Sequence, residues 1–181
     1  MSKPAVFFDR DDTLMRNVPY LGDPSKVQIF PGTADALDKL THAGFALVIV
    51  SNQSGVGRGL ITIQQVALVT EEMQRQLGDS YFTGIYNCYA APGQPGDDNR
   101  KPSPVLLQQA SVAHDLDLAK SYMVGDRLSD VLCGKNAGCK SVLVLTGPSS
   151  PEREVARNEA HFVASDLIEA AEWIVVDSKR K

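Results

Sequence analysis

Short runs of apolar residues alternate along this chain with segments in which apolar residues recur every three or four positions. The runs predict buried strands, because a strand covered on both faces is continuously apolar. The recurring pattern predicts amphipathic helices. The expected strands are 5–8, 46–50, 85–89, 122–124 and 142–145, with a weaker sixth at 161–163, and the expected helices are 33–43, 63–77, 104–114, 129–137 and 167–175.

The order strand, helix, strand repeats along the chain. This repeat is typical of α/β folds in which right-handed crossovers join parallel strands. We therefore expect one Rossmann-like α/β domain over residues 1–181, a three-layer sandwich with a mostly parallel sheet. Thr33, which follows Pro31-Gly32, is expected to cap the first long helix. Ligands of such folds bind at the carboxyl ends of the strands.

Composition narrows the possible functions. The 181 residues carry a formal net charge of -4, so the chain has no basic surplus for nucleic acid or a membrane surface. The chain reaches Asp9 too early for a signal peptide, and no apolar run approaches the roughly 20 residues of a membrane span. Three cysteines without a CxxC pair favour reduced thiols, and we expect a cytoplasmic protein.

Polar residues able to carry out chemistry follow four of the expected strands. They are Asp9 and Asp11, the segment 51–55, Arg100 with Lys101, and finally Asp126, Arg127 and Asp130. Several carboxylates around one point favour a hard cation such as Mg²⁺, which would also remove their mutual repulsion. A carboxylate can attack a phosphoryl group when positive charge lies close by, and a second carboxylic acid can transfer the proton. The strand ends therefore predict phosphate chemistry.

The same segments resemble the four motifs of the haloacid dehalogenase superfamily of phosphatases. FFDRDDTL is similar to the nucleophile motif DxDGT, VSNQSG to the second motif, RKP to the third and VGDRLSD to the fourth, in the family's order. Longer segments, among them FPGTADALDKL and AGFALVIVSNQSGVGRG, resemble a compact branch that contains heptose bisphosphate and histidinol-phosphate phosphatases. That branch implies a minimal cap, or none, over the active site.

The resemblance implies a role for each matching residue. Asp9 would be the nucleophile and a Mg²⁺ ligand, and Asp11 the general acid/base that gives its backbone carbonyl to the metal. Asp126 would be the third protein ligand of the metal. Ser51 and Lys101 would stabilise the transferring phosphoryl group. The positions matching substrate contacts are Asn17, Val18, Pro19, Tyr20, Ser51, Asn52, Gln53, Ser54, Arg100 and Arg127.

The expected partner is therefore a small phosphorylated metabolite, with Mg²⁺ as cofactor. The branch points to a sugar bisphosphate such as D-glycero-D-manno-heptose 1,7-bisphosphate, which would lose its 7-phosphate. We expect a monomer that binds neither nucleic acid nor membrane. Asp130 is expected to orient Lys101 or the metal shell rather than to bind metal directly. The loop SGVGRG, with Arg58, is expected to be a mobile turn or to lie beside the substrate.

Two departures from the family pattern matter. Asp12 stands where the motif has glycine, and we expect its side chain to turn to solvent or, alternatively, to add charge near the metal. Many members of the branch also carry a zinc loop with a C-x-H pair and a later C-x-C pair. Here those pairs read Cys88-Tyr89-Ala90 and Asp97-Asp98-Asn99, so one soft ligand remains and we predict no zinc.

Three other functions stay open from the sequence. A histidinol-phosphate phosphatase would want acidic groups at the rim for a cationic substrate, and Asp97 and Asp98 could offer them. A catalytically silent phosphate-binding module is the alternative from another class. A phosphotransferase or mutase is the third, disfavoured because a mutase must shield its phosphoenzyme from water and no cap domain is evident.

Overall fold

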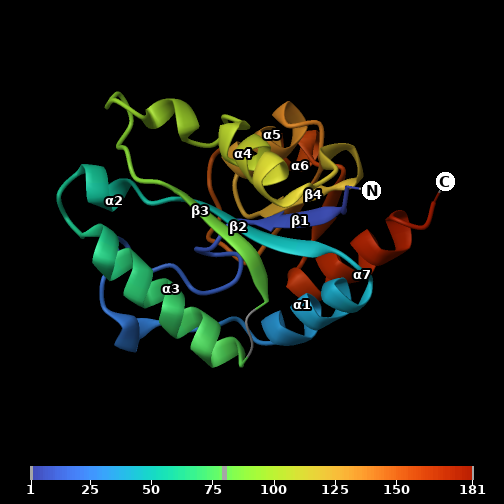
Figure 1. The fold of residues 1–181 in the computed structure, drawn as a ribbon, viewed down its shortest axis with the longest axis horizontal. Helices are drawn as coiled ribbons and strands as arrows, with labels where there is room; N and C mark the ends of the chain where they lie inside the picture. Colours follow the sequence, from blue (N-terminus) through green and yellow to red (C-terminus); the bar gives the residue numbers. More distant parts are fainter. Residues whose placement is uncertain (1, 79–80, 181) are drawn as a thin grey trace.

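The computed structural model describes residues 2–78 and 81–180 of the chain. Within these ranges, parallel strands form one sheet in the order β3-β2-β1-β4-β5-β6 (Figure 1). The strands are β1 (Ala5–Phe8), β2 (Ala46–Asn52), β3 (Phe82–Cys88), β4 (Tyr122–Gly125), β5 (Lys140–Val144) and β6 (Phe162–Ala164). The predicted Rossmann-like α/β class is confirmed, and the strand order places the topological switch point between β1 and β4.

Helices cover both faces of the sheet. They are α1 (Thr33–His42), α2 (Ser54–Gly57), α3 (Ile63–Leu77), α4 (Val105–His114), α5 (Leu128–Asn136), α6 (Arg153–Glu159) and α7 (Leu167–Asp177), with short 3-10 turns at Pro24–Lys26, Asp97–Asn99 and Leu118–Lys120. One buried cluster joins α1, α3 and α7 to the sheet, and a second joins α4 and α5 to its other face (Figure 1). The inner strands β1, β2, β4 and β5 are thus buried on both faces, which explains their continuous apolar runs, whereas the edge strands β3 and β6 are partly exposed.

Alternate residues of β1 show how the two faces are filled. Val6 and Phe8 belong to the cluster of α1, α3 and α7, whereas Ala5 and Phe7 belong to the cluster of α4 and α5. This follows from the two-residue period of a strand. Asp9 comes next in the chain, just beyond the buried part of β1, and therefore lies at the carboxyl edge of the sheet.

The predicted element bounds differ from the structure in a few places. Helices α2 and α6 were not predicted, because a four-residue glycine-rich turn and a polar seven-residue segment carry no clear helical period. The prediction that Thr33 caps α1 is wrong. The cap is Gly32, in a left-handed conformation with φ 78°, and the Thr33 hydroxyl instead donates to the carbonyl of Leu14 at 3.2 Å.

No helix within residues 2–78 and 81–180 combines the length and the apolar character that crossing a membrane would require.

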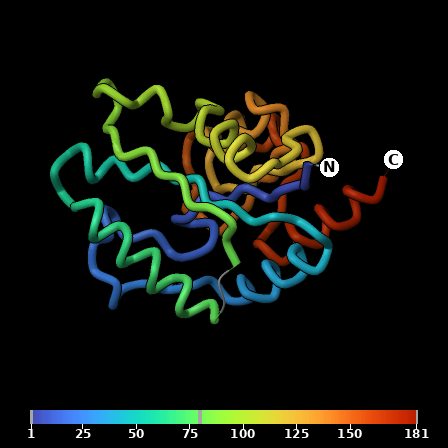
Figure 2. The backbone as a smooth tube through the Cα atoms, in the orientation of Figure 1, coloured from blue at the N-terminus to red at the C-terminus, as the bar shows by residue number. Residues whose placement is uncertain are grey.

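The backbone trace in Figure 2 shows a further feature that matters for the site. The loop that leaves β3 runs beside the turn of α2, although the two are far apart in sequence. Both segments lie at the carboxyl edge of the sheet, where ligands bind in such folds.

Candidate active site

Neighbouring strands bring the predicted carboxylates together. β1 pairs with β4, and the N–H of Asp9 donates to the carbonyl of Val124 at 2.9 Å. Side-chain oxygens of Asp9, Asp126 and Asp130 all lie within 4.8 Å of one another, and all three residues are buried. The cluster lies at the topological switch point between β1 and β4. The sequence predicted this position, because Asp9 and Asp126 follow those two strands. Such a set of oxygens in one place is costly without positive charge.

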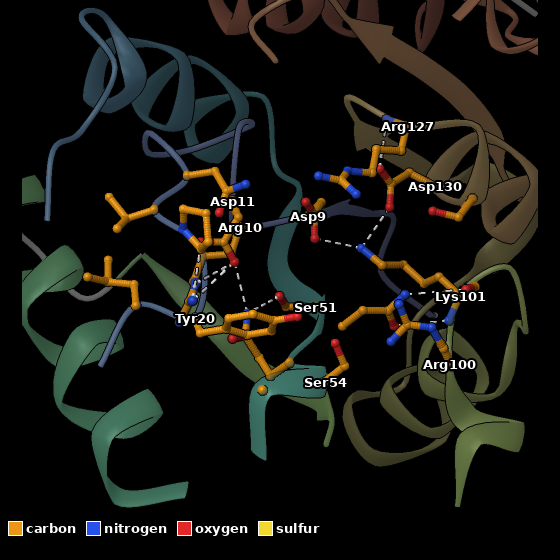
Figure 3. A pocket seen from close by; sticks show the side chains of 18 residues that line it. Asp9, Arg10, Asp11, Tyr20, Ser51, Ser54, Arg100, Lys101, Arg127 and Asp130 are labelled. Atoms are coloured by element: carbon orange, nitrogen blue, oxygen red, sulfur yellow. Dashed lines mark hydrogen bonds and ion pairs between the residues drawn. The ribbon is translucent and has the colours of Figure 1, made fainter. Parts of the chain in front are cut away.

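Lys101 lies against this cluster. Its buried ammonium donates to Asp9 Oδ1 at 2.6 Å and to the backbone carbonyl of Val50 at 2.8 Å, and it lies 2.7 Å from Asp130 Oδ1 (Figure 3). Burial alone would lower the pKa of Lys101, but the charges of Asp130 and Asp9 outweigh burial and raise that pKa. Lys101 is therefore a cation held beside Asp9.

The backbone of Lys101 is fixed as well. Its N–H donates to Asn52 Oδ1 at 3.1 Å, and its carbonyl accepts from Asn52 Nδ2 at 3.3 Å. Both ends of the Asn52 amide are thus engaged by one residue. The family resemblance marks Asn52 as a substrate contact. Here its side chain connects the end of β2 to the segment of Lys101 by these two hydrogen bonds.

Asp126 is only weakly compensated by a cation, the largely exposed Arg127. Its Oδ1 is buried and has no hydrogen-bond partner among the described residues. Arg127 Nε lies 3.8 Å from Asp126 Oδ2, beyond hydrogen-bond distance. Burial, together with the charges of Asp9 and Asp130, raises the pKa of Asp126 to about 8. A buried carboxylate in this position calls for a proton or a cation.

Two side chains hold the carboxylate of Asp11. Arg10 donates from Nε to Oδ2 and from Nη2 to Oδ1, both at 3.2 Å. Gln53 donates from Nε2 to Asp11 Oδ2 at 2.9 Å and to Ser51 Oγ at 2.7 Å. Burial raises the pKa of Asp11, and the contacts with Arg10 and Gln53 oppose that rise. A carboxyl group whose neutral form is favoured is suited to donate a proton.

Arg10 is the site residue that the sequence pattern missed. Its side chain is 2% exposed and also donates to Thr70 Oγ1 of α3 at 3.3 Å. The signal that could have found it is an arginine directly after a buried strand with an aspartate on each side, because an arginine is almost never fully buried unless it is paired.

The predicted residues line one cavity of about 310 Å³. All ten positions matched to substrate contacts border it, as do Asp9, Asp11 and Lys101, whereas Asp126 and Arg58 are not part of its lining. The residues of the lining that were not predicted are Arg10, Leu21 and Ser129. Figure 3 shows Tyr20 on the side of the cavity opposite Arg100, Lys101 and Arg127, with Ser54 between Tyr20 and Arg100.

Asp12 does not turn its side chain to solvent, and that expectation is wrong. The residue is 7% exposed and has a left-handed backbone with φ 59°. Its Oδ1 accepts the N–H of Asn17 at 3.1 Å, and its carbonyl accepts the hydroxyl of Thr146. The left-handed backbone explains the glycine of the family motif, and aspartate tolerates that region better than most residues.

Cysteine chemistry at the site is disfavoured. Burial raises the pKa of the Cys133 thiol to about 12 and that of Cys139 to about 12, so both are neutral thiols near pH 7. Cys133 donates to the carbonyl of Ser103 at 3.1 Å, a structural contact beside the segment of Lys101.

Comparison with known proteins gives one consistent result. Residues 99–170 match the family model described as HAD-hydrolase-like. The chain is 37% identical to D-glycero-beta-D-manno-heptose-1,7-bisphosphate 7-phosphatase of Haemophilus ducreyi, over 96% of this chain and 100% of the relative. It is 38% identical to the protein of the same name from Escherichia coli K12, over 98% of this chain and 97% of the relative.

A solved structure agrees with these sequence matches. The crystal structure of D,D-heptose 1,7-bisphosphate phosphatase from B. bronchiseptica, complexed with magnesium and phosphate, superposes with a TM-score of 0.83 at 28% identity. The match covers 96% of this chain and 99% of that chain. The similarity therefore extends over the sheet, the helices and the loops around the cavity.

The fold, the aspartate–lysine cluster and these relatives define the class. The chain belongs to the haloacid dehalogenase-like hydrolase family, as its four motifs predicted. Within that class it is a phosphoric monoester hydrolase.

Proposed function

We propose that this protein hydrolyses a sugar bisphosphate through an aspartyl-phosphate on Asp9, with Mg²⁺ as cofactor. The observation that carries the proposal is the bridge of Lys101 between Asp9 and Asp130, at 2.6 and 2.7 Å, beside the buried carboxylate of Asp126, whose Oδ1 has no hydrogen-bond partner among the described residues. One carboxylate is thus held against a fixed cation while another is left to receive a second cation. A nucleophile must be held in this way if it is to approach a phosphate dianion.

The residues present fit a Mg²⁺ ion. Asp126 Oδ1 is buried without a partner, burial and neighbouring charges raise the pKa of Asp126 to about 8, and oxygen atoms of the cluster lie within 4.8 Å of one another. Asp9, Asp126 and the backbone carbonyl of Asp11 would hold the ion. When bound, Mg²⁺ supplies positive charge that draws the phosphoryl oxygens toward the cluster and offsets the repulsion between carboxylates.

The chain's own residues account for the two chemical steps. The Asp9 carboxylate attacks phosphorus, the bond from phosphorus to the ester oxygen breaks, and Asp11 gives its proton to that oxygen. Asp11, now a carboxylate, takes a proton from water as the water attacks the aspartyl-phosphate. Inorganic phosphate leaves and the Asp9 carboxylate is restored. Lys101 and the Ser51 hydroxyl stabilise the charge on the transferring group in both steps.

The substrate proposal is a heptose 1,7-bisphosphate that loses its 7-phosphate. It is supported by the names of the relatives at 37% and 38% identity, which span nearly the whole chain. The cavity also offers two arginines beyond the reacting centre. Nη1 of Arg100 is buried without a partner among the described residues, and the guanidinium of Arg127 is exposed at the cavity. Guanidinium groups suit a distal phosphate, because they bind it bidentately.

The alternatives are less well supported. A histidinol-phosphate phosphatase would use Asp97 and Asp98 as acidic groups at the rim, but neither residue lines the cavity, and Asp97 Oδ2 accepts the N–H of Gly93 at 2.6 Å. A silent binding module gives no reason for a lysine buried against Asp9. A mutase would need more cover than the short segments 9–32 and 89–104 give.

The test is phosphate release from a small aryl phosphate and from the heptose bisphosphate, with and without Mg²⁺. Asp9→Asn should lower kcat at least about a thousandfold on both substrates, because the amide is a poor nucleophile. Asp35→Asn, an exposed aspartate on α1, is the matched control and should leave turnover unchanged. Full turnover by Asp9→Asn, or release independent of Mg²⁺, would refute the mechanism. Faster turnover of histidinol phosphate than of the heptose bisphosphate would refute the substrate.

A further inference from the structure

Gly57, the last residue of α2, makes two hydrogen bonds to the loop that leaves β3, in addition to the bond from the N–H of Gln53 to the carbonyl of Cys88 at 2.8 Å. The N–H of Gly57 donates to the carbonyl of Tyr89 at 2.9 Å, and the carbonyl of Gly57 accepts from Gln94 Nε2 at 3.1 Å. Gln94 Oε1 in turn accepts the N–H of Ala91 at 3.0 Å. We call Gly57, Tyr89, Ala91 and Gln94 the Gly57 seam; the two segments that it joins run side by side in Figure 2.

The close approach at the seam requires glycine. A Cβ on Gly57 would lie 2.5 Å from Gln94 Oε1, 2.6 Å from the nitrogen of Ala91 and 2.8 Å from the carbonyl oxygen of Tyr89. Two of these three atoms are backbone and cannot move aside easily. Gly57 is not among the residues with positive φ, so its value lies in its missing side chain and not in its conformation.

The same loop contains the four positions that a zinc site would occupy in the related branch: Cys88, Ala90, Asp97 and Asn99. The side chains of two of them, Cys88 and Asp97, make hydrogen bonds within the loop. Cys88 Sγ donates to the carbonyl of Gly96 at 3.7 Å, and Asp97 Oδ2 accepts the N–H of Gly93 at 2.6 Å. Hydrogen bonds thus connect the segments that a metal would otherwise join, and the seam adds a connection to α2.

The seam lies between two walls of the cavity. Ser54 begins α2, three residues before Gly57, and Arg100 follows the Asp97–Asn99 turn, where its N–H donates to the carbonyl of Asp97 at 2.8 Å. Both Ser54 and Arg100 line the cavity. Lys101, in contrast, is anchored independently by Asn52, Asp9 and Asp130, so loosening the seam leaves the reacting centre in place.

We propose that Gln94 and Gly57 are positioning residues that hold the 89–99 loop in place of a bound metal. Through the loop they set the position of Arg100 against the part of the substrate beyond the reacting phosphoryl group. The inference rests on the proposed function, because it requires that the distal phosphate of a bisphosphate binds at the side of the cavity that contains Arg100. Neither residue contacts the reacting atoms.

The experiment compares two substrates in the full chain. Gln94→Ala should raise KM for the heptose bisphosphate roughly three- to tenfold, the range expected when one or two net hydrogen bonds that order a loop are lost. Turnover and KM for p-nitrophenyl phosphate, which has no distal phosphate, should stay unchanged. Gly57→Ala should give the same split or a larger one. Gln94→Glu keeps the acceptor for Ala91 but loses the donor to Gly57, and should fall between wild type and Gln94→Ala.

Matched controls separate positioning from a general loss of stability. Gln108→Ala removes an exposed glutamine on α4 and should change neither substrate's KM. Gly84→Ala introduces a clash with side chains only, 2.8 Å from His114 Nε2, at a residue outside the cavity lining, and should also leave the KM ratio of the two substrates unchanged. An equal KM change for both substrates in Gln94→Ala would overturn the proposal.

Hydrogen exchange gives a readout that needs no substrate. The amide of Ala91 should exchange several-fold faster in Gln94→Ala than in wild type, and peptides covering Arg100 should exchange faster with it. Unchanged exchange would overturn the seam even if the heptose bisphosphate proves not to be a substrate. The proposal would also be overturned if the purified protein contained one equivalent of zinc and if removing that zinc raised KM for the bisphosphate.

Discussion

Replacing Asp12 by glycine would restore the family residue and test what this chain gained from the change. The bond from the Asn17 N–H to Asp12 Oδ1, at 3.1 Å, would be lost. A hydrogen bond to a charged group contributes about 1.5–3 kcal/mol. Glycine would relieve the left-handed backbone, with φ 59°, by about 1–2 kcal/mol.

The midpoints of the two ranges leave a net destabilisation of about 0.8 kcal/mol, which the loss of the repulsion between Asp12 and Asp126 reduces further. For a chain of this size, each kcal/mol shifts Tm by about 2–4 °C. We therefore expect Asp12→Gly to lower Tm by roughly 1–3 °C in thermal unfolding without Mg²⁺. The loop that begins at Asn17 lines the cavity, so KM for the bisphosphate should rise as well.

Asp12→Asn is the matched variant. Asparagine keeps the Oδ1 acceptor and tolerates the left-handed region, but carries no charge. It should keep the KM of wild type while weakening Mg²⁺ binding a few-fold, because Asp12 adds negative charge beside Asp126. If Asp12→Gly matches wild type in both Tm and KM, the bond to Asn17 contributes nothing and the reasoning fails. If Asp12→Asn behaves like Asp12→Gly, the charge and not the hydrogen bond is what matters.

Two further predictions concern the cluster itself. In the metal-free protein the pKa of Asp126 is about 8 against an ordinary 3.8, so the folded protein keeps a proton that the unfolded chain has lost, and stability falls as pH rises between these values. Because Mg²⁺ needs the carboxylate, the rise in Tm on adding Mg²⁺ should grow from about pH 6 to about pH 8, and a rise that is flat with pH would contradict this. Lys101→Met leaves Asp9 and Asp130 buried without their cation. We therefore expect kcat to fall at least about a hundredfold and the free energy of unfolding, measured in urea, to drop by about 3–5 kcal/mol. A free energy of unfolding equal to that of wild type would show that the bridge is not needed.

The sequence by itself was sufficient for the architecture. Continuous apolar runs such as 46–50 are local, and so is the three-to-four-residue period of 63–77, which the structure reproduces as α3 with the same bounds. The order of those elements implies a parallel sheet, and a parallel sheet gathers its strand ends at one edge. Asp9 and Asp126 could therefore be placed together before any contact was known.

Only the tertiary structure decided how the gathered residues use one another. That Lys101 bridges Asp9 to Asp130, that Arg10 is buried against Asp11 and Thr70, and that Asp12 bonds to Asn17 all depend on which atoms meet. The same is true of Gly57, whose glycine is explained by a loop more than thirty residues away and not by its own conformation. Periodicity and motif spacing are properties of neighbours along the chain, whereas hydrogen-bond partners, burial and pKa shifts arise between segments that meet only when the chain is folded.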